Sequence, residues 1–215
     1  MRFPLWLRIA ATLFAMVFII VHWHYDNLIN FLWLSDIGMF GAVAALWLRS
    51  RLLASMMLVA TVLSDGLGWT LDFILGILVG WHPLNATTYM FDPGVPLIVR
   101  ALSLFHLFVP ALLVWMVHRL GYDRRALGAQ TAFTIVLFWV SYVVAGPLRN
   151  INWVFGPGQP QSYVPGWLYL IAMMTAFPVM CYVPVHLILI ALRWDRREAP
   201  PPARAGEPSE AMPKP

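Results

Sequence analysis

Long apolar segments are the feature that most constrains the fold of this chain of 215 residues. A helix needs about 20 residues to cross a hydrocarbon layer of about 30 Å. Six segments are long and apolar enough, and they cover residues 4–22, 29–48, 52–80, 96–118, 127–146 and 166–192. Only 11% of the residues are charged, whereas a soluble domain has about 25%. The sequence therefore predicts an all-α, polytopic membrane protein, a bundle of six transmembrane helices.

The third segment is longer than a straight span requires, so we expect it to tilt, to kink near Gly66 or Gly68, or to project beyond the bilayer. Residues 1–198 are expected to form the transmembrane domain, and the Pro- and Ala-rich residues 199–215 a disordered cytoplasmic tail. The single cysteine, Cys181, excludes an intrachain disulfide. Neither a metal site nor a cofactor is predicted.

The positions of the basic residues orient the predicted bundle. With six crossings, twelve of the 14 Lys and Arg residues fall on one side, and only Arg100 and Arg149 fall on the other. The positive-inside rule then places both termini in the cytoplasm, as in a multi-pass protein of a bacterial inner membrane. The net charge of +4 is distributed between the apolar segments and forms no patch, so nucleic acid is not expected as a partner.

Polar side chains recur at one depth near the outer ends of three predicted helices. Ser35 and Asp36 lie about 10 Å inside the second segment, and Asp72 and His106 lie at a similar depth in the third and fourth. An ionised carboxylate there costs at least about 2.5 kcal/mol, so it is usually retained for a partner or a function. Serine with histidine and a carboxylate is the composition of an activated nucleophile. Ser35 would attack, His106 would be the general base, and Asp36 or Asp72 would orient it.

Four polar residues lie just outside this layer and are expected to hold the substrate, its oxyanion or a lipid headgroup. They are Arg100, Arg149, Asn150 and Asn152. Ordinary interhelical hydrogen bonding is the competing explanation for the whole set, because serine and a buried His–Asp pair often serve only to pack helices.

Three motifs, in their order, resemble a known family. NFLWLSDIGMF, around Ser35, resembles the nucleophile helix of the androgen-induced family of intramembrane hydrolases, which cleave fatty-acid esters of hydroxy fatty acids and have threonine there. A related six-helix membrane acyltransferase and its bacterial relatives have cysteine followed by aspartate, to which Ser35–Asp36 would correspond. SLFHLFVPALL resembles the helix of the family's histidine, and RNINWVFGPGQP is similar to a segment of the bacterial relatives. The resemblance implies that His106 takes that histidine's role and that Asn152 is a site residue. Serine at the nucleophile departs from the family's pattern.

The sequence thus favours a lipid-directed acyl hydrolase or acyltransferase whose hydrophobic substrate enters laterally from the membrane. A proton-coupled transporter or small-molecule-binding protein would use Asp36, Asp65, Asp72 and His106 instead, and it predicts polar groups that continue past Asp65. In a third hypothesis, a scaffold or assembly subunit, the same side chains only specify helix packing. The sequence predicts neither the lipid nor the oligomeric state.

Overall fold

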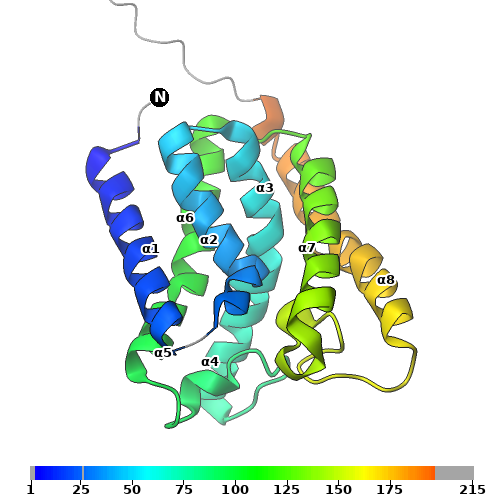
Figure 1. The fold of residues 1–215 in the computed structure, drawn as a ribbon. Helices are drawn as coiled ribbons and strands as arrows, with labels where there is room; N and C mark the ends of the chain where they lie inside the picture. Colours follow the sequence, from blue (N-terminus) through cyan, green and yellow to red (C-terminus); the bar gives the residue numbers. More distant parts are fainter. Residues whose placement is uncertain (1–2, 26, 197–215) are drawn as a thin grey trace, which may run out of the picture.

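The computed structural model describes residues 3–25 and 27–196, and within these ranges all regular structure is helical. Figure 1 shows the helices packed side by side in one bundle. Five segments are long and apolar enough to cross a membrane: Leu5–Tyr25, Arg51–Val79, Leu97–Leu120, Ala126–Arg149 and Gly166–Ala191. A sixth apolar helix, Leu34–Leu48, is shorter. The prediction of an all-α, multi-pass membrane bundle is confirmed.

Breaks divide three of these spans into shorter elements. The elements α1 (Leu5–Tyr25) and α2 (Leu34–Leu48) are unbroken, and α7 (Ala126–Arg149) is regular up to a kink at Gly146, where the backbone is not helical. The third span consists of α3 (Arg51–Thr61), a π-helical stretch η2 (Val62–Trp69) and α4 (Thr70–Val79). The fourth consists of α5 (Leu97–Ser103) and α6 (Phe105–Leu120). The last consists of α8 (Gly166–Phe177), a second π-helical stretch η5 (Pro178–Tyr182) and α9 (Val183–Ala191). Short 3-10 turns are η1 (Leu28–Leu32), η3 (Thr88–Phe91), η4 (Ile151–Trp153) and η6 (Trp194–Arg196).

The break in the third span falls where the sequence predicts a kink, since η2 contains both Gly66 and Gly68. A Cβ on Gly66 would lie 3.0 Å from Cβ of Pro110, so η2 and α6 approach closely at this point. Such π-helical turns interrupt regular helix hydrogen bonding and are frequent at functional sites. The break therefore lies where η2 packs against α6.

The second helix begins later than the sequence predicts, at Leu34 instead of residue 29. Residues 28–32 form the turn η1, which the Asn27 side chain caps by accepting a hydrogen bond from the Ile29 N–H at 3.1 Å. The Asn152 side chain then accepts from the Leu34 N–H at 2.8 Å and takes the place of a local N-cap. Ser35 consequently lies in the first turn of α2, at the end of the bundle and not seven residues into a helix.

Helix α3 occupies the centre of the bundle, between α2 and α7 (Figure 1). Its residues Ala54, Val59 and Ala60 have no exposed surface. A Cβ on Gly38 or Gly41 of α2 would overlap side chains of α3. Small residues thus bring α2 and α3 close together, as is common for helices that associate in lipid.

The two ends of the bundle differ in composition. At one end, called here the arginine-rich end, lie the connections that contain Arg51, Arg124 and Arg125 (Figure 1). At the other, called here the loop end, lie the long connections 80–96 and 150–165. The predicted disordered tail, residues 199–215, lies outside the described residues.

Candidate functional site at the loop end

His106 lies in the first turn of α6, directly after the break at Leu104. Its Nδ1 lies 2.7 Å from the carbonyl oxygen of Ser103. Because a carbonyl oxygen can only accept a hydrogen bond, Nδ1 carries the proton and Nε2 carries the lone pair. The imidazole stacks on Trp69 of η2, with ring centroids 4.7 Å apart and planes within 6° of parallel. The break thus fixes both the tautomer and the orientation of a potential base.

Trp69 and Tyr89 bring two hydrogen-bond donors to this histidine. Trp69 is 5% exposed, and its indole N–H, although close to the Tyr89 hydroxyl, meets no acceptor with full hydrogen-bond geometry among the residues that the structure describes. The Tyr89 hydroxyl lies beside Ser103 and Trp69. Burial raises the pKa of Tyr89, so the phenol remains a neutral donor. We call these four residues, His106, Trp69, Tyr89 and Ser103, the His106 cluster.

Two carboxyl groups interact electrostatically with this cluster. The charges of Asp36, on α2, and Asp65, on η2, both raise the pKa of Tyr89 further. Asp36 is 6% exposed. None of the ion pairs between described residues involves Asp65. Acidic side chains in a membrane-spanning segment are a default indication of function, because their insertion is costly.

Ser35 is half-buried in the first turn of α2, beside Asp36. Its hydroxyl has no hydrogen-bond partner among residues 3–25 and 27–196. A serine inside a helix usually bonds the carbonyl four residues earlier, but here that residue, Phe31, belongs to η1 and not to α2. The position also lies at the positive end of the helix dipole, which stabilises negative charge.

Asp72 is engaged by the loop that follows α4. Its Oδ1 accepts from the Leu84 N–H at 2.7 Å. Its Oδ2 accepts from the Ala86 N–H at 3.1 Å, and from the N–H and hydroxyl of Thr87 at 2.9 and 2.7 Å. None of these contacts joins it to His106, whose Nδ1 is held by a carbonyl instead. Asp72 anchors the loop that carries Tyr89, so it acts on the cluster only through that loop.

Asn150 and Asn152 use their side chains to shape the loop end. Asn152 Nδ2 donates to the Leu32 carbonyl at 2.8 Å and to the Ser141 hydroxyl at 3.0 Å. Asn150 donates to the Gly156 carbonyl at 2.8 Å and accepts from the Phe155 N–H at 2.9 Å. Asn152 thereby positions the start of α2, and with it Ser35.

The two arginines at this end differ. Arg100 donates to the Met90 carbonyl at 3.2 Å, next to Tyr89. Its buried Nε has no partner among the described residues. Arg149 is exposed at the end of α7. The structure therefore brings Arg100 to the loop that carries Tyr89 and leaves Arg149 on the surface.

An apolar groove of about 260 Å³ runs between α1, α2 and α6. Its walls include Met39 and Ala42 of α2 and Phe105, Phe108 and Val109 of α6. Phe105 stacks against His106 with ring centroids 4.1 Å apart, so one wall of the groove directly adjoins the cluster. Met39 lies one helical turn from Ser35, on the same face of α2. The groove therefore extends away from the polar residues along the apolar spans.

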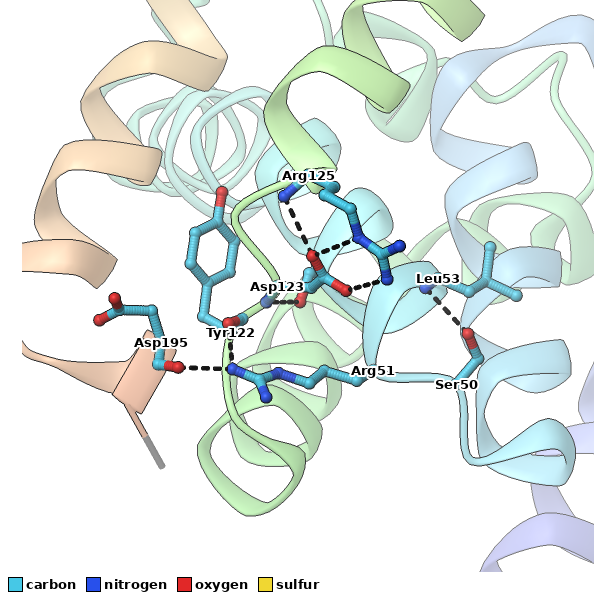
Figure 2. Close-up of polar contacts among 8 residues, drawn as sticks. Ser50, Arg51, Leu53, Tyr122, Asp123, Arg125 and Asp195 are labelled. Atoms are coloured by element: carbon cyan, nitrogen blue, oxygen red, sulfur yellow. Dashed lines mark hydrogen bonds and ion pairs between the residues drawn. The ribbon is translucent and has the colours of Figure 1, made fainter. Parts of the chain in front are cut away.

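A second polar group occupies the arginine-rich end, where Arg51 donates to the carbonyl oxygens of Tyr122 and Asp195, both at 2.6 Å (Figure 2). Arg124 pairs with Asp195 at 2.6 Å, and Arg125 pairs with Asp123 at 2.9 Å. We call these residues the Arg51 cluster. They surround a pocket of about 180 Å³, lined by Arg51, Tyr122, Asp123, Arg124 and Asp195.

Sequence reasoning missed Trp69, Tyr89 and Ser103. Ser103 could have been found because it lies three residues before His106, the spacing of neighbours on a helix. Tyr89 gives no such signal, because its position depends on a loop that Asp72 and Arg100 hold. As for metals, no group of three His, Cys, Asp or Glu side chains within the described ranges could hold an ion.

The comparisons with known proteins found no relative. No family model matches the chain, and no match was found among curated proteins or solved structures. The family resemblance of the sequence motifs therefore stays a prediction.

Proposed function

We propose that the protein is a membrane-embedded acyl hydrolase or acyltransferase that acts on a lipid ester. In this proposal Ser35 is the nucleophile and His106 Nε2 is the general base. The arginine-rich end would face the cytoplasm of a bacterial inner membrane, and the His106 cluster would lie near the outer leaflet. Substrate would enter laterally from the bilayer, and no cofactor would be required.

The observation that carries the proposal is the tautomer of His106. With Nδ1–H bonded to the Ser103 carbonyl, Nε2 is the nitrogen that can accept a proton. A base is most effective when a third group fixes its tautomer. A backbone carbonyl can fix it, although without the negative charge by which a carboxylate also stabilises the imidazolium. The carbonyl thus takes the orienting role that the sequence suggested for Asp36 or Asp72.

The surrounding groups suit an ester substrate. The Trp69 indole N–H meets no acceptor with full hydrogen-bond geometry among described residues, and the Tyr89 phenol lies beside it, so both could donate to an oxyanion. The apolar groove next to Phe105 suits an acyl chain. Ser35, at the start of α2, would have its alkoxide stabilised by the helix dipole.

The test is covalent labelling of the purified protein in detergent by a fluorophosphonate probe. Wild type, Ser35→Ala, His106→Asn and Ser64→Ala would be compared at equal amounts of folded protein. The amide of His106→Asn can still donate to the Ser103 carbonyl but lacks the basic nitrogen. Ser64→Ala is the serine control, because the Ser64 hydroxyl bonds the Ala60 carbonyl at 2.9 Å and the neighbouring Asp65 side chain, and it is not part of the His106 cluster.

The proposal requires labelling of wild type and Ser64→Ala, and loss of labelling in Ser35→Ala and His106→Asn. Labelling that persists in Ser35→Ala would exclude Ser35 as the nucleophile. If both site variants lose folded protein instead of reactivity, the residues serve packing, as in a scaffold subunit.

A further inference from the structure

Polar side chains do not end at the His106 cluster but continue through the bundle on two further spans. We propose that Asp65, Tyr182 with Thr134, and His186 with Tyr122 form a proton route from the loop end to the arginine-rich end. This activity is separate from the proposed acyl transfer, since it uses neither Ser35 nor His106.

Asp65 connects the two halves of the bundle. It lies at the midpoint of the span Arg51–Val79, in the π-helical stretch η2, which packs against the second π-helical stretch, η5. On the loop side its charge acts on Tyr89, and on the other side it acts on Cys181 and Tyr182 of η5. One buried carboxyl group is therefore the common neighbour of both polar regions.

A buried hydrogen-bonded chain follows on η5 and α7. The hydroxyls of Tyr182 and Thr134 lie 2.7 Å apart, and Gln130 Nε2 donates to the Thr134 hydroxyl at 3.1 Å. Tyr182, Thr134 and Gln130 have no exposed surface. Gln130 Oε1 has no donor among the described residues, although it is buried. An unsatisfied acceptor of this kind is a binding place for a water molecule beside the chain.

The next protonatable group is one helical turn away. His186 lies four residues after Tyr182, so the two side chains share a face of the last span. Its Nδ1 lies 2.6 Å from the hydroxyl of Tyr122. Arg124 and Asp195, which line the 180 Å³ pocket of the Arg51 cluster, act electrostatically on His186. The chain of polar groups thus ends at a charged pocket on the arginine-rich end.

Each step would be a proton transfer through a hydroxyl, an imidazole or a bridging water. One O–H or N–H bond breaks while another forms, no electron moves, and water is the only co-reactant. The competing explanation is that these bonds only specify helix packing. Rows of Asp, His and hydroxyl groups inside spans are typical of proton relays, and here the row leads from Asp65 at the middle of the bundle to the charged pocket at the arginine-rich end.

The test uses the full chain in liposomes of phosphatidylethanolamine and phosphatidylglycerol loaded with a pH-sensitive dye. A potassium gradient with valinomycin makes the interior negative and drives proton entry. We expect wild type to acidify the interior faster than protein-free liposomes, and Asp65→Asn and Tyr182→Phe to lose this excess rate. Thr175→Ala is the control, because the exposed Thr175 hydroxyl bonds only the Ile171 carbonyl of its own helix, at 3.1 Å.

Two outcomes would overturn the inference. Wild-type flux no greater than that of protein-free liposomes would leave the chain as a packing network. Flux retained by Asp65→Asn, with unchanged thermal unfolding, would exclude the central carboxyl group from the route. If Tyr182→Phe fails to fold, Asp65→Asn decides alone, since Asp65 makes no ion pair with a described residue. Neither outcome bears on fluorophosphonate labelling.

Discussion

The two polar clusters at opposite ends of the bundle differ in how their hydrogen bonds are satisfied. In the Arg51 cluster each charged side chain has at least one partner. Arg51 binds two carbonyl oxygens (Figure 2), and Asp123 and Asp195 each pair with an arginine, although Arg51 Nε and Asp195 Oδ1 are buried without a partner among the described residues. In the His106 cluster the imidazole has one fixed nitrogen, and the Trp69 N–H meets no acceptor with full hydrogen-bond geometry among the described residues. Buried polar groups without partners are destabilising.

This difference separates groups that hold the fold from groups that are available for chemistry. A cluster whose charged side chains each have a partner joins loops, and its loss should lower stability. In a cluster where a donor and a base stay unpaired, these two groups do not stabilise the fold. Removing either group should therefore lower activity and not stability. The predictions below test whether the pairing of a group, and not the end of the bundle where it lies, decides which property changes.

The largest effect is expected for Asp72→Ala, because Asp72 is a paired group at the loop end. The variant removes an acceptor for three backbone N–H groups and a hydroxyl. The free energy of unfolding should fall by about 3 kcal/mol or more, since buried donors remain unsatisfied. Thermal unfolding followed by tryptophan fluorescence measures this loss. Asp92→Ala is the control, because Asp92 is exposed and bonds only the Gly94 N–H in the same loop. Equal shifts in the two variants would contradict the anchoring role.

Trp69→Phe, in contrast, should lower the labelling rate more than it lowers stability. The change keeps an aromatic ring for His106 to stack on and removes only the indole N–H, which lies close to the Tyr89 hydroxyl, so stability should fall less than in Asp72→Ala. If the indole N–H stabilises the oxyanion, the rate of fluorophosphonate labelling should fall about 10²-fold. Trp167→Phe, at a residue 60% exposed on α8, should leave the rate unchanged. A normal labelling rate in Trp69→Phe would remove Trp69 from the site.

Arg51→Ala tests the paired cluster at the arginine-rich end. The variant leaves the carbonyl oxygens of Tyr122 and Asp195 without their donor. We expect a loss of about 2 kcal/mol in the free energy of unfolding, with labelling per folded molecule unchanged. Arg119→Ala is the matched control, because Arg119 is exposed and lies over the Trp115 ring at 5.5 Å. A reduced labelling rate in folded Arg51→Ala would mean that the two clusters are coupled.

The sequence predicted the bundle well because apolar length is a local property. Five long spans and a shorter one occur where the six segments were expected, and the third span breaks at its glycines. The start of α2 could not be predicted, since it depends on a hydrogen bond from the Leu34 N–H to the side chain of Asn152, 118 positions further along the chain. Helix boundaries set by such distant side chains leave no periodic signal.

Candidate residues were predicted by depth, and depth does not specify direction. His106 and Asp36 are linked through shared neighbours: Trp69 stacks on His106, and Tyr89, which lies beside Trp69, feels the charge of Asp36. Asp72 lies at a comparable depth but faces its own loop. The partners of a polar side chain depend on helix rotation and loop path, and these follow from the packing of the whole bundle.

The smallest expected effect is a change of stability in acid, because the ion pair concerned includes an exposed arginine. Asp123 accepts hydrogen bonds from the Arg125 side chain at 3.1 and 2.9 Å and from its N–H at 3.0 Å, and these bonds lower the pKa of Asp123. A lowered pKa in the folded state gives stabilisation that is complete above the unfolded pKa of about 3.9 and is lost as the pH falls through the folded value. The melting temperature should therefore decline on acidification below about pH 4, and less steeply in Asp123→Asn. The decline should be slight, since exposed pairs contribute little and are screened by salt. An identical pH profile in wild type and Asp123→Asn would mean that this pair, although formed, contributes nothing to the stability of the arginine-rich end.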